Sequence, residues 1–252
     1  MVKHNGAILL CGGSNNFAKC LQLDNWTWKE HSTFNERRLL HSTVTTKCAT
    51  FIFGGIKSST TYEYLLKDST TWLMGKNEIP GGFQSGCAIA VKSEKEIWLV
   101  GGLETTKRIL SFNVNDHTFQ ELSLQLNMER YRHRCAFIPK TNKILVTGGF
   151  NLTTKALDST EIIDTENGKV TLTESPLNFK RYGHGIGIVT INEEDRLAIF
   201  GGINEYYNSN DSVEIYNTKK DKWEKTGIKL NEPKGYFGFL TIRLSDIISK
   251  LR

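Results

Sequence analysis

Residues 97–102 read IWLVGG and residues 144–149 read ILVTGG, and a short apolar run closed by two glycines occurs five times in the 252 residues. The glycine pairs begin at residues 12, 54, 101, 148 and 201, so the spacings are 42, 47, 47 and 53 residues. Self-similarity at such a period is typical of a repeat architecture. The first glycine lets the backbone leave a buried strand, and the second lets the next loop pack closely. The sequence therefore predicts one structural unit used five times.

Two further features recur behind the glycine pairs. A second predicted strand carries an apolar or aromatic residue that is followed by another large apolar residue, usually seven positions on. These residues are Leu23 and Trp28, Leu65 and Trp72, Phe112 and Phe119, Ile163 and Val170, and Tyr216 and Trp223. The other feature is an arginine three residues before a histidine, which opens the apolar run leading to the next glycine pair. It occurs at Arg38 and His41, Arg130 and His133, and Arg181 and His184.

The double glycine, the tyrosine–tryptophan pair and the arginine together resemble the kelch repeat over essentially the whole chain. Each unit contains four short predicted strands, and no stretch has a helical period. The resemblance implies an all-β, five-bladed kelch β-propeller with four antiparallel strands per blade. Members of this family usually have six or seven blades, so part of a longer propeller is the alternative to a closed five-bladed ring.

The ends of the chain suggest how the ring closes. No inner strand is expected before Ala7–Cys11, and the predicted strand Phe237–Leu244 has no glycine pair after it. We therefore expect the C-terminal strand to join the first blade as its innermost strand. The chain is then a single domain, 1–252, with blade 1 at 1–33 plus 235–252 and the later blades at 34–79, 80–127, 128–178 and 179–234.

Composition excludes several functional classes. Hydrophobic residues make up 38% and charged residues 23%, as in a globular domain, and no apolar stretch is long enough to cross a membrane. The net charge of +5 comes without a basic run, which argues against nucleic-acid binding. We expect a monomer without metal or cofactor. The cysteines are expected to be reduced core residues of a cytoplasmic protein. They are Cys11, Cys20, Cys48, Cys87 and Cys135.

Candidate binding residues are expected on the propeller face where the connections between blades meet the loops after the glycine pairs. Guanidinium groups around a channel mouth suit carboxylates or phosphates, and kelch adaptors use matching arginines for acidic peptides. In the two connections without a recurring arginine, Lys234 takes the equivalent position in one and Phe83 with Gln84 in the other. The expected ligand-binding residues of the connections are Arg38, Arg130, Arg132, Arg181, Lys234 and Phe83. The loop 204–211 adds Tyr206 and Tyr207, because tyrosine is common at interfaces. The alternative is that the arginines only brace neighbouring blades, as we expect of the histidines.

These features favour a protein-interaction module that binds a partner, through an acidic segment, and performs no chemistry. An adaptor or scaffold of this kind has no catalytic residue. The alternative is a small-molecule enzyme of the sialic acid epimerase or a related kelch-like type, because that site is also rich in arginine. No nucleophile elbow, phosphate loop or paired-carboxylate motif is present in the sequence.

Overall fold

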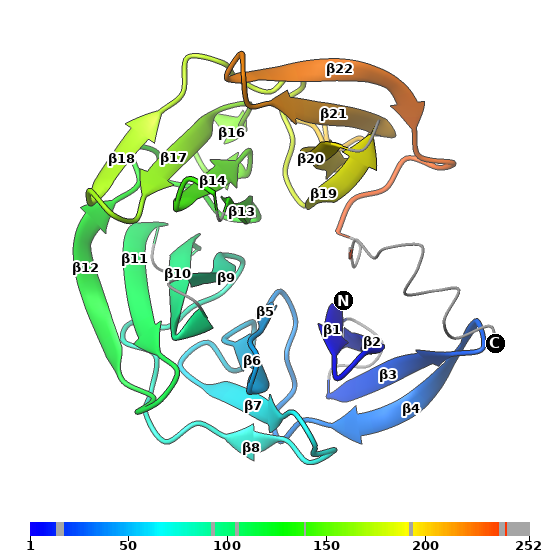
Figure 1. Cartoon of the computed structure of the whole chain (residues 1–252), viewed down its shortest axis with the longest axis vertical. Coiled ribbons are helices and arrows are strands. Elements are labelled where there is room, and N and C mark those ends of the chain that lie inside the picture. Colours follow the sequence, from blue (N-terminus) through cyan, green and yellow to red (C-terminus); the bar gives the residue numbers. More distant parts are fainter. Residues whose placement is uncertain are drawn as a thin grey trace.

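The computed structural model describes residues 1–13, 18–91, 94–103, 106–138, 140–191, 194–236 and 240. Over these residues the strands form five four-stranded antiparallel sheets and one two-stranded hairpin. The sheets stand around a ring as the blades of a β-propeller (Figure 1). The predicted all-β, five-bladed architecture is confirmed. In this part of the chain no helix has the length and hydropathy of a membrane span.

Each blade follows the chain from the centre of the ring outward. Blade 1 contains β1 (Val2–His4), β2 (Ala7–Cys11), β3 (Lys19–Asp24) and β4 (Thr27–Thr33). Blade 2 contains β5 (Ser42–Thr45), β6 (Ala49–Phe53), β7 (Tyr62–Leu66) and β8 (Leu73–Met74). Blade 3 contains β9 (Cys87–Val91), β10 (Glu96–Gly102), β11 (Thr106–Asn113) and β12 (Phe119–Gln125).

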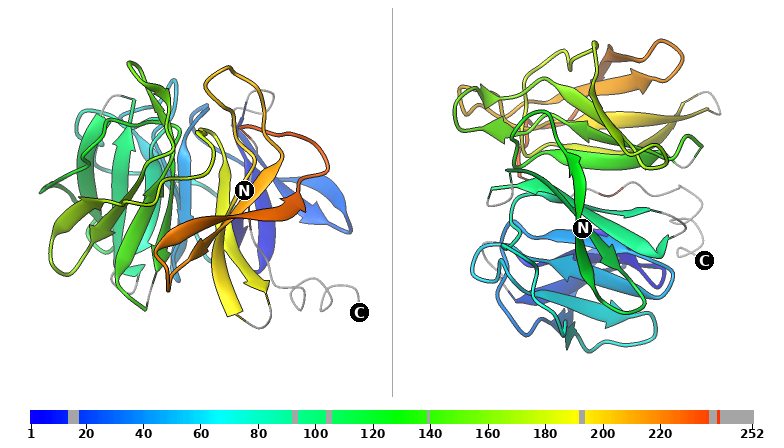
Figure 2. Two further views of the ribbon diagram at one scale, coloured as in Figure 1. Left: turned by 90° about the horizontal axis from the view of Figure 1, so that it is seen from above. Right: turned by 90° about the vertical axis from the view of Figure 1, so that its left-hand side faces the viewer.

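The last two blades follow the same order. Blade 4 contains β13 (Arg134–Ile138), β14 (Lys143–Thr147), β17 (Thr160–Asp164) and β18 (Lys169–Leu172), with the small hairpin β15 (Phe150–Asn151) and β16 (Lys155–Ala156) inserted after β14. Blade 5 contains β19 (Gly185–Ile191), β20 (Glu194–Phe200), β21 (Ser212–Asn217) and β22 (Lys222–Lys229). Figure 2 shows most strands crossing the thickness of the ring, with turns and connections at its two faces.

The second strand of each blade is the apolar run that ends in a glycine pair. It has a strand on both edges and a neighbouring blade on at least one face, so all five residues of β6 are buried. The hydrophobic core lies between the blades. Phe51 and Phe53 of blade 2, for example, contact the ring of Phe112 in blade 3 with centroid distances of 5.5 and 5.2 Å.

The glycine pairs make close contacts between neighbouring blades possible. All ten glycines of the pairs have positive φ, between 54° and 116°. A Cβ on the first glycine would also meet the next histidine, because it would lie 2.8 Å from His133 Cε1 at Gly101 and 3.0 Å from His184 Cε1 at Gly148. Glycine is therefore needed here for both conformation and space.

The recurring tryptophans also join neighbouring blades. Trp72 Nε1 of blade 2 donates a hydrogen bond to Ser32 Oγ of blade 1 at 2.9 Å. Trp223 Nε1 of blade 5 donates to Thr160 Oγ1 of blade 4 at 3.1 Å. Both indoles are almost completely buried. The hydrogen bond satisfies a polar group that would otherwise be buried alone.

Ring closure differs from the expectation. The place beside Ala7–Cys11 is taken by β1, with Val2 opposite Leu9 and His4 opposite Ala7. The expectation that the C-terminal strand lies there is therefore wrong. The sequence of β1 is only three residues long and contains Lys3 and His4, so it lacks the apolar run that marks the other inner strands. Apart from Leu240, the segment Phe237–Leu244 lies outside the described residues.

Candidate functional site

The three recurring arginines are buried inside the blades. Arg38, Arg130 and Arg181 are 0%, 1% and 0% exposed. Each forms an ion pair with a buried glutamate on the third strand of its blade, and the N–O distances are 3.1 Å (Arg38–Glu63), 2.8 Å (Arg130–Glu161) and 2.6 Å (Arg181–Glu214). The expectation that these guanidinium groups face solvent at the channel mouth is wrong. Their geometry is that of the alternative, in which the arginines brace the fold.

Each ion pair belongs to a larger hydrogen-bond network. Arg130 Nη1 donates to the Gly148 carbonyl at 2.7 Å, and Arg130 Nη2 donates to Ser159 Oγ at 2.9 Å. The backbone and side-chain amides of Asn127 donate to Glu161 Oε2 at 2.6 and 3.0 Å. Buried charges are tolerated when they are paired and hydrogen-bonded in this way. The sequence signals of the network are N-x-x-R before the inner strand and S/T-x-E on the third strand, and our sequence analysis missed the glutamates.

The expectation that Phe83 contacts a ligand is also wrong. Its side chain is 1% exposed and lies in the apolar core of blades 2 and 3. Its backbone, however, occupies the position of the arginines, because the Gly55 amide donates to the Phe83 carbonyl at 2.8 Å. The same bond joins Gly102 to Arg130 and Gly149 to Arg181. Phe83 is therefore a core residue at a repeat position and offers no surface to a ligand.

The recurring histidines are neutral packing groups. Burial lowers the pKa of His41 and His133 to about 3, and burial together with the nearby Arg134 lowers the pKa of His184 well below its ordinary value. His184 Nε2 is hydrogen-bonded to Thr147 Oγ1 at 2.9 Å. Among the residues that the structure describes, no group of three or more histidine, cysteine, aspartate or glutamate side chains is arranged to hold a metal ion.

The connections between blades and the loops after the glycine pairs meet on one face, as predicted. Isolated β-bridges join the two loop sets at Leu39 and Ile56, Tyr131 and Phe150, and Tyr182 and Ile203. One residue of each connection has a left-handed backbone. From the second connection on, the amide of this residue donates to the carbonyl of the same position in the preceding connection, over 2.5–2.9 Å. This chain of bonds runs through Leu40, Ser85, Arg132, Gly183 and Tyr236.

Among the arginines of the connections, Arg132 is the one that takes part in this chain of backbone bonds on the loop face. Its guanidinium lies 5.4 Å from the ring centroid of Tyr131, 6.0 Å from Tyr182 and 5.0 Å from Tyr236. Arg132 Nη1 also donates a hydrogen bond to the Tyr236 hydroxyl. The side chain is half-buried, and within the described residues it forms no ion pair. It is thus a cation held by aromatic faces, and no carboxylate of the described residues pairs with it.

Aromatic rings continue from Arg132 across blades 4 and 5. The ring centroids are 5.5 Å apart for Tyr131 and Phe150, 5.0 Å for Phe150 and Tyr182, and 5.8 Å for Tyr182 and Tyr236. We call Arg132 with these four rings the mouth cluster. Sequence reasoning missed its aromatic members, although Tyr131 and Tyr182 directly follow Arg130 and Arg181, and Tyr236 comes two residues after Lys234.

The hydroxyls of the mouth cluster stay protonated. Burial raises the pKa of Tyr236 to about 12, and it also raises the pKa of Tyr131 and Tyr182. A protonated phenol can donate a hydrogen bond, as can the guanidinium. The cluster therefore offers a plane of positive charge and several donors to a ligand that accepts hydrogen bonds.

The loop 204–211 stands beside the mouth cluster, and Tyr207 is among the groups that act on the pKa of Tyr131 and Tyr182. Tyr206 is 74% and Tyr207 68% exposed. Asn204 Oδ1 accepts the Tyr206 amide at 2.9 Å, and an ion pair of 2.9 Å joins Glu205 to Lys180. Two large rings are thus held in solvent by an ordered loop.

Lys234 lies at the equivalent position of the connection after blade 5, as expected. Its carbonyl accepts the Gly202 amide at 2.7 Å, which is the bond that the arginine carbonyls accept in other blades. Its side chain is 53% exposed and pairs with Glu232 at 3.3 Å. The structure thus brings Arg132, Lys234, Tyr206 and Tyr207 to the same face of the propeller. Ligand contact by these four residues stays a prediction.

The cysteines differ from the expectation. Disulfides join Cys11 to Cys20 and Cys87 to Cys135, whereas Cys48 is free and exposed. The expectation of reduced core residues is therefore wrong for four cysteines, which are oxidised, and wrong for Cys48 in its burial, so it no longer supports a cytoplasmic location. The partners could not be seen in the sequence because the fold brings them together: Cys11 lies directly opposite Cys20 in the β2–β3 ladder.

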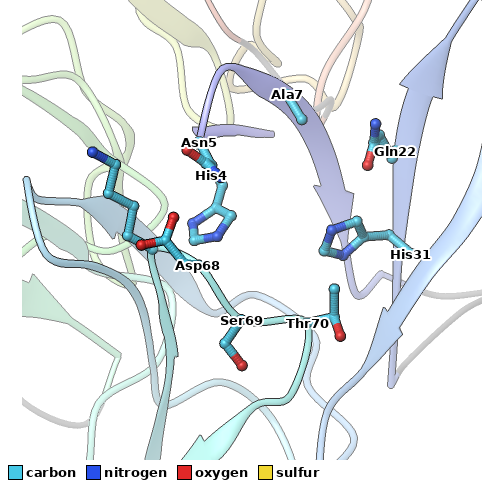
Figure 3. Close-up of a pocket in the computed structure, with 9 residues that line it drawn as sticks. His4, Asn5, Ala7, Gln22, His31, Asp68, Ser69 and Thr70 are labelled. Atoms are coloured by element: carbon cyan, nitrogen blue, oxygen red, sulfur yellow. The ribbon is translucent and has the colours of Figure 1, made fainter.

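A separate cavity of about 430 Å³ lies between blades 1 and 2. Figure 3 shows the rings of His4 and His31 facing one another across it, with the Asp68 carboxylate beside His4. Burial lowers the pKa of both histidines. The lining is polar except for Ala7, and it comes from β1, β2 and the turn between them, from β3 and β4, and from the β7–β8 turn. Unlike the mouth cluster, its lining contains no phenylalanine, tyrosine or tryptophan.

Comparison with known proteins agrees with the repeat pattern. The kelch motif matches residues 196–227, which contain the glycine pair, the tyrosine and the tryptophan of blade 5. A kelch repeat-containing protein of Dictyostelium discoideum is 27% identical over 153 residues, which are 59% of this chain and 22% of that protein. The chain thus spans about a fifth of this relative's length. The kelch resemblance is confirmed, and kelch repeats are commonly protein-interaction modules.

Proposed function

We propose that this propeller is a protein-interaction module, an adaptor or scaffold that binds an acidic segment of a partner protein at the mouth cluster. The observation that carries the proposal is Arg132, a half-buried guanidinium that lies among three tyrosine rings and has no carboxylate beside it in the described structure. A carboxylate of the partner supplies the missing counter-charge through a bidentate, charge-assisted hydrogen bond. The protein itself performs no chemistry in this role.

The exposed tyrosines also favour binding of the partner at this face. Tyrosine and arginine are enriched among the residues that dominate binding energy at protein interfaces. Tyr206 and Tyr207 contribute large rings at a low cost in conformational entropy, because their loop is already ordered by Asn204 and Glu205. The partner segment is therefore expected to place an acidic residue on Arg132 and an apolar or aromatic residue against Tyr207.

The carbohydrate-enzyme alternative rested on an arginine-rich site. Arg38, Arg130 and Arg181 are neutralised by glutamates inside the blades, so they do not form such a site. No observation favours this alternative over a binding module. The monomeric state and a cytoplasmic location belong to our proposal, and the location is proposed without support from the cysteines.

The test is fluorescence anisotropy with a labelled hexaglutamate peptide at low ionic strength, with a hexaglutamine peptide as the neutral probe. We expect Arg132→Ala to weaken hexaglutamate binding by about tenfold or more, because a hydrogen bond to a charged group contributes about 1.5–3 kcal/mol. Arg37→Ala is the matched control, since Arg37 is an exposed arginine on another connection. Equal loss in both variants, or equal binding of the two peptides, would contradict the proposal.

A further inference from the structure

One of the two disulfides lies within a blade, and the other joins two blades. Cys11 and Cys20 lie on neighbouring strands of one sheet, which hydrogen bonds already hold together. Cys87 and Cys135 lie on β9 and β13, the innermost strands of blades 3 and 4. These strands belong to separate sheets with no ladder between them. The Cys87–Cys135 bond is therefore a covalent link between two blades.

This link lies next to the residues that position the mouth cluster. Cys87 follows Ser85 by two residues, and Cys135 follows Arg132 by three. The Arg132 amide donates to the Ser85 carbonyl at 2.5 Å, and both residues have a φ of 57°. The connection 83–87 and the connection 130–135 are thus joined twice, once by this hydrogen bond and once by the disulfide.

We propose that the Cys87–Cys135 disulfide is a redox-controlled modification site that sets the position of Arg132 and so the affinity of the mouth for its acidic partner. This proposal rests on the proposed function. The ligand of the site is a low-molecular-weight thiol. Two such thiols cleave the S–S bond by successive exchange, so that two protein thiols form, the two small thiols become one disulfide, and two electrons enter the protein with two protons.

Cleavage affects the mouth because the two sulfur atoms must then separate to a non-bonded distance. The surrounding side chains are closely packed, since Cys87 and Cys135 are 6% and 7% exposed and lie in one apolar cluster with Val100 and Val146. Packed interiors do not absorb such a change without movement of the backbone. Among the described residues, the backbone hydrogen bond that joins the two connections is that of Arg132 with Ser85, so this bond weakens and the guanidinium shifts relative to the tyrosine rings.

The burial of both sulfur atoms also determines how the site responds. Thiol–disulfide exchange requires access to a sulfur atom. With less than a tenth of either cysteine exposed, reduction is slower than for an exposed disulfide. The mouth therefore keeps its oxidised state through brief exposure to thiols and changes only when the reducing conditions persist.

The first measurement is hydrogen exchange, read by mass spectrometry, on peptides that cover residues 131–136 of the full chain before and after dithiothreitol. We expect exchange at the Arg132 amide to become faster by about fivefold or more, the lower end of typical coupling between two sites. Reoxidation should restore the protection. The Cys11→Ser/Cys20→Ser variant, which keeps Cys87–Cys135, should respond as the wild type does. In the Cys87→Ala/Cys135→Ala variant, the Arg132 amide should exchange fast both with and without dithiothreitol.

The second measurement repeats the hexaglutamate titration in both redox states, with an expected loss of affinity of about fivefold or more on reduction. Failure of hexaglutamate to bind in either state counts against the proposed function, whereas the exchange data still decide the present proposal. Unchanged exchange at residues 131–136 on verified reduction would overturn it. So would alkylation of Cys87 and Cys135 in protein purified without reductant. If the double alanine variant does not fold, the wild-type comparison remains decisive.

Discussion

Phe83 and Leu110 occupy in blade 3 the two positions that a buried arginine and a buried glutamate occupy in blades 2, 4 and 5. Leu110 lies opposite Leu99, two residues before the glycine pair, as Glu161 lies opposite Val146 in blade 4. Both blade 3 side chains are 1% exposed and belong to the same apolar cluster. Pro80 stands where Asn127 donates its amide in blade 4, and proline has no amide hydrogen to donate. The ion pair and its donors are therefore replaced together.

This replacement predicts how blade 4 responds to substitution. Glu161→Gln leaves the buried guanidinium of Arg130 without its counter-charge, and we expect the free energy of unfolding to fall by about 3–5 kcal/mol. The double variant Arg130→Phe/Glu161→Leu should lose less than the single variant, because an apolar pair removes both charges. Denaturant unfolding measures both, with the exposed Glu174→Gln as the control. A double variant less stable than Glu161→Gln would contradict this interpretation of blade 3.

The glycine pairs predict a contrast between two glycines of positive φ. A Cβ at Gly148 would overlap the Arg181 carbonyl and lie 3.0 Å from His184 Cε1, whereas a Cβ at Gly6 would meet nothing within 4 Å. Alanine costs about 1–2 kcal/mol at either position for its left-handed backbone. Only Gly148→Ala adds overpacking, about 1–3 kcal/mol more. Thermal unfolding of the two variants checks this, and equal losses would show that the inter-blade contact is unimportant.

The repeat pattern was enough to predict the blades, the face on which the loops meet and the equivalence of Lys234 and Phe83 with the arginines. Each of these depends on spacing along the chain. It was not enough to predict the ion pairs, because Arg130 and Glu161 are 31 residues apart and an arginine at a surface connection and one inside a blade have the same sequence signal. The strand Val2–His4 was missed for a different reason, since three residues carry too little periodicity to mark a strand.

The candidate site was likewise predictable only where spacing along the chain determines a residue's position. The positions of Tyr206, Tyr207 and Arg132 on the loop face could be predicted from the repeat, because they are set by the loops of blades 4 and 5. The mouth cluster could not, since Tyr131, Tyr182 and Tyr236 come together only when the connections stack through their backbone bonds. The disulfide between Cys87 and Cys135 likewise depends on the contact between two blades.

The inter-blade hydrogen bond of Trp223 predicts a loss that an exposed tryptophan does not show. Trp223→Phe removes the donor to Thr160 Oγ1, which is completely buried, and leaves unfilled space. We expect the free energy of unfolding to fall by about 1–3 kcal/mol, the cost of an unsatisfied buried group. Trp26→Phe is the control, because Trp26 is 69% exposed. A Trp223→Phe variant as stable as Trp26→Phe would mean that the bond contributes nothing.

The buried histidines predict that, as the pH falls, the fold begins to lose stability at a pH well above the range in which carboxylates titrate. Burial lowers the pKa of His41 and His133 to about 3 in the folded chain, and the unfolded chain has a histidine pKa of about 6.5. The stability that the neutral rings provide is therefore complete above pH 6.5 and is lost as the pH falls from 6.5 toward 3, because the unfolded state binds the protons more tightly.

Each such histidine should remove about 1.4 kcal/mol of unfolding free energy for every pH unit in that interval. Urea unfolding at pH 7.5, 6.5 and 5.5 measures the slope. His133→Gln is expected to be less stable at pH 7.5 and to show a flatter pH dependence than the wild type, since it has one proton fewer to bind on unfolding. His31→Gln is the matched control, because the His31 side chain is only partly buried. A His133→Gln variant that keeps the full wild-type slope would show that this ring is already protonated in the folded chain.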